Sequence, residues 1–149
     1  MRALELLAGN KIWMSAVTGW FVAQVLKTLI HTLFTRSFDP ERLIGSGGMP
    51  SSHAATVCAM AAAAAKLYGA GSFEFAITAI LAVIVMHDAM GVRLETGKQA
   101  KLLNEILATF RTLDGKKLTE DKLKEFVGHT PLQVLAGALL GIAIGFGMS

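Results

Sequence analysis

The chain has 149 residues, the size of one domain, and 53% of them are hydrophobic while only 17% are charged. Because a soluble domain carries about 25% charged residues, this composition excludes an ordinary water-soluble protein, and it excludes a disordered chain as well. The single cysteine, Cys58, excludes a disulfide framework and a cysteine-based zinc site, and a net charge of +3 with one tyrosine leaves no basic, aromatic surface for nucleic acid.

The composition therefore predicts an all-α integral membrane bundle that forms a single domain over residues 1–149. Four apolar segments are expected to be its membrane helices: 12–34, 52–67, 73–86 and 130–149. A spanning helix needs about 20 mostly apolar residues, which the first and last segments provide. The two middle segments have uncharged centres of roughly 12 residues, a length that also suits short buried or re-entrant helices. Two interpretations follow: four membrane helices, or a bundle with short inner helices.

The region 87–129 is expected to be an amphipathic, helical loop. Within 97–110, Ala100, Leu103 and Leu107 recur near one helical face. A second, shorter helix is expected over 119–127, after a turn at Asp114-Gly115. We expect both helices to lie against the bundle.

The distribution of positive charge predicts how the bundle is oriented. Four helices place successive loops alternately on the two sides of the membrane. The side with loops 35–51 and 87–129 carries 11 of the 14 basic residues, with Lys27 counted on that side. Since loops rich in Lys and Arg stay in the cytoplasm, this side is predicted to be cytoplasmic in the cell membrane, and both termini face away from it.

Polar residues gather where helices are predicted to begin and end. The glycine-rich segment 45–53 precedes the second helix, 87–93 closes the third, and 128–131 opens the fourth, while Arg36 follows the first. Under the alternating topology all of these positions lie at one membrane face. Ionisable residues at the ends of membrane helices are costly unless they are paired or hydrated, so they are candidates for function.

These residue types suit the hydrolysis of a phosphate ester without a metal ion or other cofactor. Two histidines at helix starts can divide nucleophilic attack from proton delivery. Fixed cations can hold the phosphate oxygens. A capping serine and the amides at a helix N-terminus form an anion site, and glycine permits close approach of the backbone. The candidate residues are His53 and His129 for catalysis, and Lys27, Arg36, Gly48, Ser51, Ser52 and Arg93 for the phosphate.

Each of these residues also has a structural interpretation. Ser51 can simply cap a helix, Lys27 and Arg36 can extend their charges to the headgroups, and Asp88 with Arg93 can form an ion pair at a helix end. His31 and His87 are interpreted as structural. The glycines of the last helix recur every fourth residue, which predicts a packing ridge and a candidate contact for a homo-oligomer or a membrane complex: Gly137, Gly141 and Gly145.

Two motifs carry a family resemblance. The segment Gly-Met-Pro-Ser-Ser-His at 48–53 resembles the Pro-Ser-Gly-His signature of the type 2 phosphatidic acid phosphatase superfamily. The segment Gly-His-Thr-Pro-Leu-Gln-Val-Leu-Ala-Gly at 128–137 resembles its later histidine signature. Together with Asp-Ala-Met-Gly-Val-Arg at 88–93, the chain resembles the divergent branch of that superfamily, a group of small bacterial and plastid membrane proteins.

The resemblance implies roles for particular residues. His129 is similar to the nucleophile, His53 to the general acid, and Ser51 to the serine that contacts phosphate. Gln133 stands where the superfamily has an acidic residue that orients the nucleophile. Asp88 is our hypothesis for that orienting role.

Three functions follow, in order of preference. The first is a membrane-embedded, metal-independent phosphatase that hydrolyses a lipid or polyprenyl phosphate monoester through a phosphohistidine at the cytoplasmic face. The second is a non-catalytic protein that binds or transports phospholipid or another anion with the same pocket. The third is a structural subunit of a membrane complex. Membrane lipid is the expected partner and a lipid phosphate the expected substrate, whereas the third function predicts a partner protein that co-purifies.

Overall fold

The computed structural model describes residues 2–38, 48–114 and 128–149. Over these ranges the chain forms helices and no strands, which confirms the all-α prediction. The helices are α1 (Arg2–Gly9), α2 (Lys11–Thr35), α3 (Ser52–Tyr68), α4 (Phe73–Met90), α5 (Val92–Asp114) and α6 (Pro131–Met148). Four of them, α2, α3, α4 and α6, cover the four apolar segments of the sequence, and the short α1 was not predicted.

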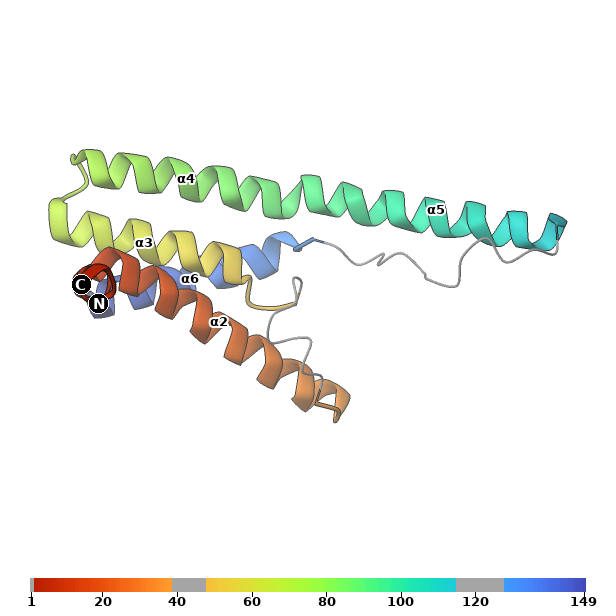
Figure 1. The fold of residues 1–149 in the computed structure, drawn as a ribbon, viewed down its shortest axis with the longest axis horizontal. Helices are drawn as coiled ribbons and strands as arrows, with labels where there is room; N and C mark the ends of the chain where they lie inside the picture. The colour runs from red at the N-terminus through yellow and green to blue at the C-terminus, as the bar shows by residue number, and fades with distance from the viewer. Residues whose placement is uncertain (1, 39–47, 115–127) are drawn as a thin grey trace.

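These four helices run alternately in opposite directions (Figure 1). Helices α2 and α4 start at the end of the bundle where both chain termini lie, and α3 and α6 return to it. The last turns of α2 and α4 and the first turns of α3 and α6 therefore lie at the other end, here called the distal end. Helix α2 diverges from α3 and α6 as it approaches the distal end.

Three stretches are long and apolar enough to cross a membrane: Lys11–Thr35, Phe73–Thr109 and Pro131–Met148. Helix α3 is not among them, because it has only 17 residues and is rich in alanine. It nevertheless runs from the distal end to the opposite end. Helix α2 before it ends at the distal end, and α4 after it starts at the opposite end. Its length of roughly 25 Å approaches the thickness of a bilayer core. Nine of its residues are buried, so α3 is surrounded mainly by neighbouring helices of the chain.

Close backbone approach joins α3 to its neighbours. A methyl group at Gly137, Gly141 or Gly145 of α6 would overlap the backbone carbonyl oxygens of α3, which belong in turn to Ser51, Ala55 and Ala59. The glycines and the carbonyls share the same spacing of four residues. On α2, a Cβ at Gly19 would lie 2.8 Å from the Ala55 oxygen. The glycine ridge is thus buried against α3 within the chain.

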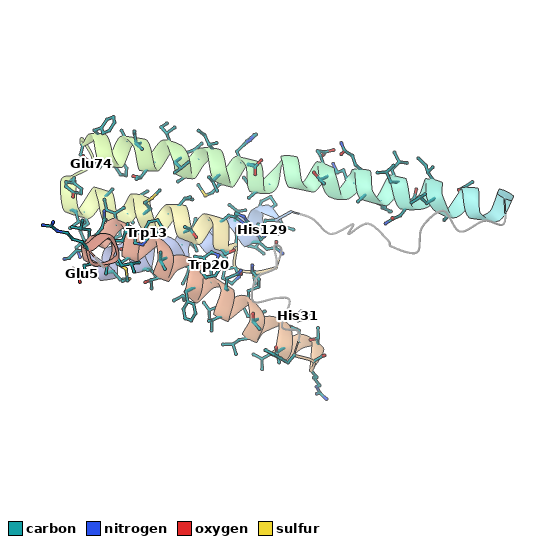
Figure 2. All side chains as sticks on the ribbon, viewed as in Figure 1. Glu5, Trp13, Trp20, His31, Glu74 and His129 are labelled. Carbon is teal, nitrogen blue, oxygen red and sulfur yellow. The ribbon has the colours of Figure 1, made fainter. Side chains whose placement is uncertain are left out.

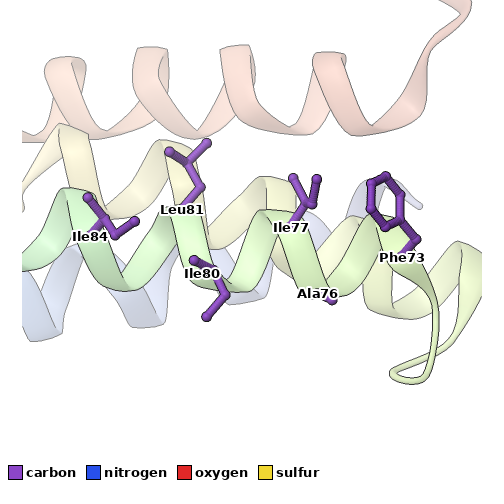
Figure 3. Close-up of a pocket in the computed structure, with 6 residues that line it drawn as sticks. All are labelled: Phe73, Ala76, Ile77, Ile80, Leu81 and Ile84. Atoms are coloured by element: carbon purple, nitrogen blue, oxygen red, sulfur yellow. The ribbon is translucent and has the colours of Figure 1, made fainter.

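The outer faces of the bundle are apolar. On α4, large exposed side chains line a groove of about 410 Å³ formed by Phe73, Ala76, Ile77, Ile80, Leu81 and Ile84 (Figure 3). A soluble monomer rarely exposes a continuous apolar surface of this kind. Such a surface is typical of a helix that faces the acyl chains of a membrane.

The position of helix α5 differs from the predicted one. The amphipathic helix forms, but it continues the direction of α4, leaves the bundle and contacts only α4 among the described helices (Figure 1). It does not lie against the bundle, and Leu102, Leu103 and Ile106 stay exposed. The second predicted helix, 119–127, lies outside the described residues.

Candidate functional site

Backbone hydrogen bonds fasten three helix ends together at the distal end. The N–H of Ser51, before α3, donates to the Gln133 carbonyl in the first turn of α6 at 3.0 Å. The N–H of His129, before α6, donates to the Ala89 carbonyl in the last turn of α4, also at 3.0 Å. Residues from three separated segments are therefore held in a fixed arrangement.

Two helix N-termini meet in this arrangement. The Ser51 hydroxyl caps α3 by accepting from the Ala54 N–H at 3.4 Å. Thr130 caps α6, where it forms a reciprocal capping box with Gln133 ahead of Pro131. Because the N-terminus of a helix carries partial positive charge and free amides, this pair of ends favours an anion.

The two predicted catalytic histidines lie together. The ring centroids of His53, in the first turn of α3, and His129 are 5.7 Å apart, and the ring planes meet edge to face at 64°. His129 is 1% exposed, and His53 is half-buried. Figure 2 labels His129 at the start of α6. The two rings meet because each histidine lies at the N-terminus of its helix, and α3 and α6 run in the same direction (Figure 1).

Gln133 fixes the tautomer of His129. Its side-chain oxygen accepts from the Thr130 N–H at 3.1 Å, and that backbone group can only donate, so the amide oxygen and not its nitrogen must face it. The same oxygen lies 3.2 Å from Nδ1 of His129. We therefore assign the hydrogen to Nδ1, which leaves the lone pair of the neutral ring on Nε2.

Lys27 turns into the bundle rather than toward the headgroups. Its side chain is 2% exposed, and Nζ donates to the side-chain oxygen of Gln24 at 2.6 Å and to the Ser52 hydroxyl at 3.5 Å. Gln24 was not among the predicted site residues. Its signal was an amide three residues before a lysine, on the same face of an otherwise apolar helix.

Comparison with known proteins identifies the family. The model of the Divergent PAP2 family matches residues 8–144. The chain belongs to this divergent PAP2 family. It is 37% identical to the uncharacterized membrane protein YuiD of Bacillus subtilis (strain 168) over 150 residues, which cover 95% of this chain and 94% of YuiD. No solved structure matches the chain. The resemblance inferred from the two histidine motifs is confirmed, and this is a PAP2-related membrane protein.

In this divergent PAP2 protein Gly48 packs against Lys27. Its φ of +83° lies in the left-handed region, and a Cβ there would lie 3.1 Å from Cγ of Lys27. A side chain at this position would be strained and would press on the lysine stem. The close approach that glycine permits here is therefore to the methylene stem of the buried Lys27.

The other predicted site residues lie differently. Arg36 is exposed and caps the C-terminus of α2 in the left-handed conformation, nine residues and roughly 13 Å beyond Lys27 along the helix. Since α2 diverges there, the described contacts do not join Arg36 to the histidines. Asp88 is half-buried and precedes Ala89, whose carbonyl accepts from the His129 N–H, so its orienting role stays a prediction beside the contact that Gln133 makes. The side chain of Arg93 lies outside the described part of the chain.

Proposed function

We propose that this protein is a membrane-embedded phosphatase that hydrolyses a lipid or polyprenyl phosphate monoester through a phosphohistidine. The observation that carries the proposal is the His53–His129 pair. Gln133 binds Nδ1 of His129, which leaves the lone pair of the ring on Nε2. A nitrogen lone pair with a second histidine beside it is the combination that attack and proton delivery require.

The reaction proceeds in two steps. Nε2 of His129 attacks phosphorus, so that an N–P bond forms while the P–O bond to the lipid alcohol breaks. Protonated His53 gives its proton to the departing oxygen. Neutral His53 then takes a proton from water, which attacks the phosphohistidine, releases inorganic phosphate and restores His129.

Positive charge near the pair supports this chemistry. Lys27 reaches Ser52, the neighbour of His53, and the N-termini of α3 and α6 add partial charges. Phosphoryl transfer depends mainly on positioning and on such stabilisation of the phosphate oxygens. Gln133 holds the His129 ring in place but, being neutral, does not offset the positive charge that the ring gains.

The neutral side chain of Gln133 and the burial of His129 favour a second function. A pocket with a neutral orienting group can hold a phosphate without cleaving it. We propose this binding or transport role as the alternative. It predicts binding of a lipid phosphate that survives His129→Ala.

The deciding experiment measures phosphate release by the detergent-purified protein over a panel of lipid phosphates with EDTA present. We expect His129→Ala and His53→Ala each to lower release by about 10³-fold or more. His87→Ala is the matched control, because His87 is an exposed histidine of α4 and should leave release unchanged. If both site variants still release phosphate at the wild-type rate, the proposed phosphatase mechanism is wrong. No release by folded wild type, with lipid phosphate still bound, selects the alternative.

We also propose that the site faces the cytoplasm of the cell and takes its substrate from the membrane. The excess of basic residues on the distal side supports this orientation.

A further inference from the structure

A cavity of about 180 Å³ adjoins the candidate site and has no part in the reaction described above. It lies between the C-terminal half of α2 and the segment that precedes α3. Its walls are formed by Lys27, Ile30, His31, Phe34, Gly48 and Met49. Figure 2 labels His31 on this part of α2.

Lys27 belongs to both the cavity and the site. Its Nζ contacts the Ser52 hydroxyl beside His53, while its stem passes Gly48 on the cavity wall. A phosphate held at Nζ therefore has the cavity directly beside it. The Lys27 side chain thus links the cavity to the position that the proposed reaction gives to the phosphate.

The walls change in character away from Lys27. His31 follows Lys27 by one helical turn on the same face, and it adds one hydrogen-bonding group. Ile30, Phe34 and Met49 are apolar, and Phe34 and Met49 are exposed at 87% and 40% on the outer surface. A cation at the inner end and apolar walls that open outward match a molecule with a charged head and an apolar chain.

The volume limits what the cavity can take. About 180 Å³ corresponds to roughly six water molecules at ~30 Å³ each. It is smaller than the ~300–1,000 Å³ of a pocket that encloses a whole ligand. The cavity can therefore hold the few atoms that follow the phosphate ester oxygen, while a longer chain continues into the bilayer.

We infer that this cavity is the subsite for the first part of the substrate's chain, and that Ile30, His31 and Met49 determine specificity for chain-bearing phosphate monoesters over short ones. The inference rests on the proposed function, because the cavity gains its role from a phosphate at Lys27. It adds a location and residues for chain selection that the two histidines do not provide.

The test compares hexadecyl phosphate with ethyl phosphate, which differ only in chain length, in detergent micelles. Met49→Trp fills the cavity from its outer wall. We expect it to lower the ratio of kcat/KM for hexadecyl phosphate to that for ethyl phosphate by about 10-fold or more. Met148→Trp is the matched control, because Met148 is equally exposed, at 39%, and lies at the far end of α6. Its ratio should equal that of wild type.

Calorimetric binding of hexadecyl phosphate to the same variants separates the inference from the proposed function. Weaker binding to Met49→Trp but not to Met148→Trp supports the subsite even if wild type releases no phosphate. Equal binding and an unchanged ratio overturn it even if wild type is an active phosphatase. Ile30→Trp fills the same cavity from α2 and decides the matter if Met49→Trp does not fold.

Discussion

At the scale of single residues, the orienting partner of His129 decides how the site can work. One oxygen of Gln133 serves both the cap of α6 and Nδ1 of His129. A glutamate at this position would keep both contacts, because a capping box accepts Glu as readily as Gln. It would also place a negative charge against a ring that becomes positive during the proposed attack.

Gln133→Glu should therefore increase phosphate release. A hydrogen bond to a charged group is worth about 1–1.5 kcal/mol more than a neutral one, which corresponds to roughly a tenfold faster reaction. Steady-state release from a lipid phosphate measures the change. Thr130→Ala is the control, since it removes the other half of the capping box and leaves the contact to His129. It should cost about 1 kcal/mol of stability and give no gain in rate. A rate for Gln133→Glu at or below wild type contradicts the orienting role.

At the scale of helices, the contact of α3 with α6 holds the site together. The glycines of α6 face carbonyl oxygens of α3 along a shared row, which begins at Ser51, the residue that caps α3. Small residues on both helices allow this approach, and van der Waals packing between them replaces the hydrophobic effect that is absent in lipid.

Gly141→Ala should destabilise the protein by about 2–3 kcal/mol. The added methyl group would overlap the Ala55 oxygen, and this overpacking outweighs the gain of about 1 kcal/mol in helix propensity. Gly147→Ala, on the same helix, is the control, because nothing lies within 4 Å of its Cβ position. It should be neutral or slightly stabilising. Thermal unfolding in a mild detergent measures both variants, and equal stabilities would show that the α3–α6 contact tolerates a larger separation.

At the scale of the whole molecule, topology places both termini at one end and the candidate site at the other (Figure 1). The four segments alternate in direction, so even the short α3 must pass from one end to the other. The orientation of this arrangement in the membrane is predicted from the basic residues of the distal side.

Cysteine labelling tests that orientation. In a Cys58→Ala background, we expect Gly71→Cys to react with a membrane-impermeant maleimide on intact cells, because Gly71 is exposed at the end with the termini. Ser37→Cys, exposed at the distal end, should react only after the cells are permeabilised. The reverse pattern would place the candidate site on the outer face of the membrane.

The sequence by itself determined the helices and much of the site. Apolar length and helical spacing predicted the four main helices, since each segment must satisfy its own backbone and present apolar side chains to lipid. The alternation of directions then brought His53 and His129 to one end. The spacing of four residues between Gly137, Gly141 and Gly145 also indicated a packing ridge, although not its partner.

Only the tertiary structure decided which polar groups meet. Lys27 and Arg36 are equally basic, but Lys27 is buried against Ser52 while the divergence of α2 leaves Arg36 exposed. Gln133, which the superfamily pattern replaces with an acidic residue, contacts Nδ1 of His129. Helix α5 leaves the bundle although its amphipathic pattern suited a packed helix. A sequence pattern specifies what one segment needs, whereas the rotation and crossing of a helix depend on the side chains that its neighbours present.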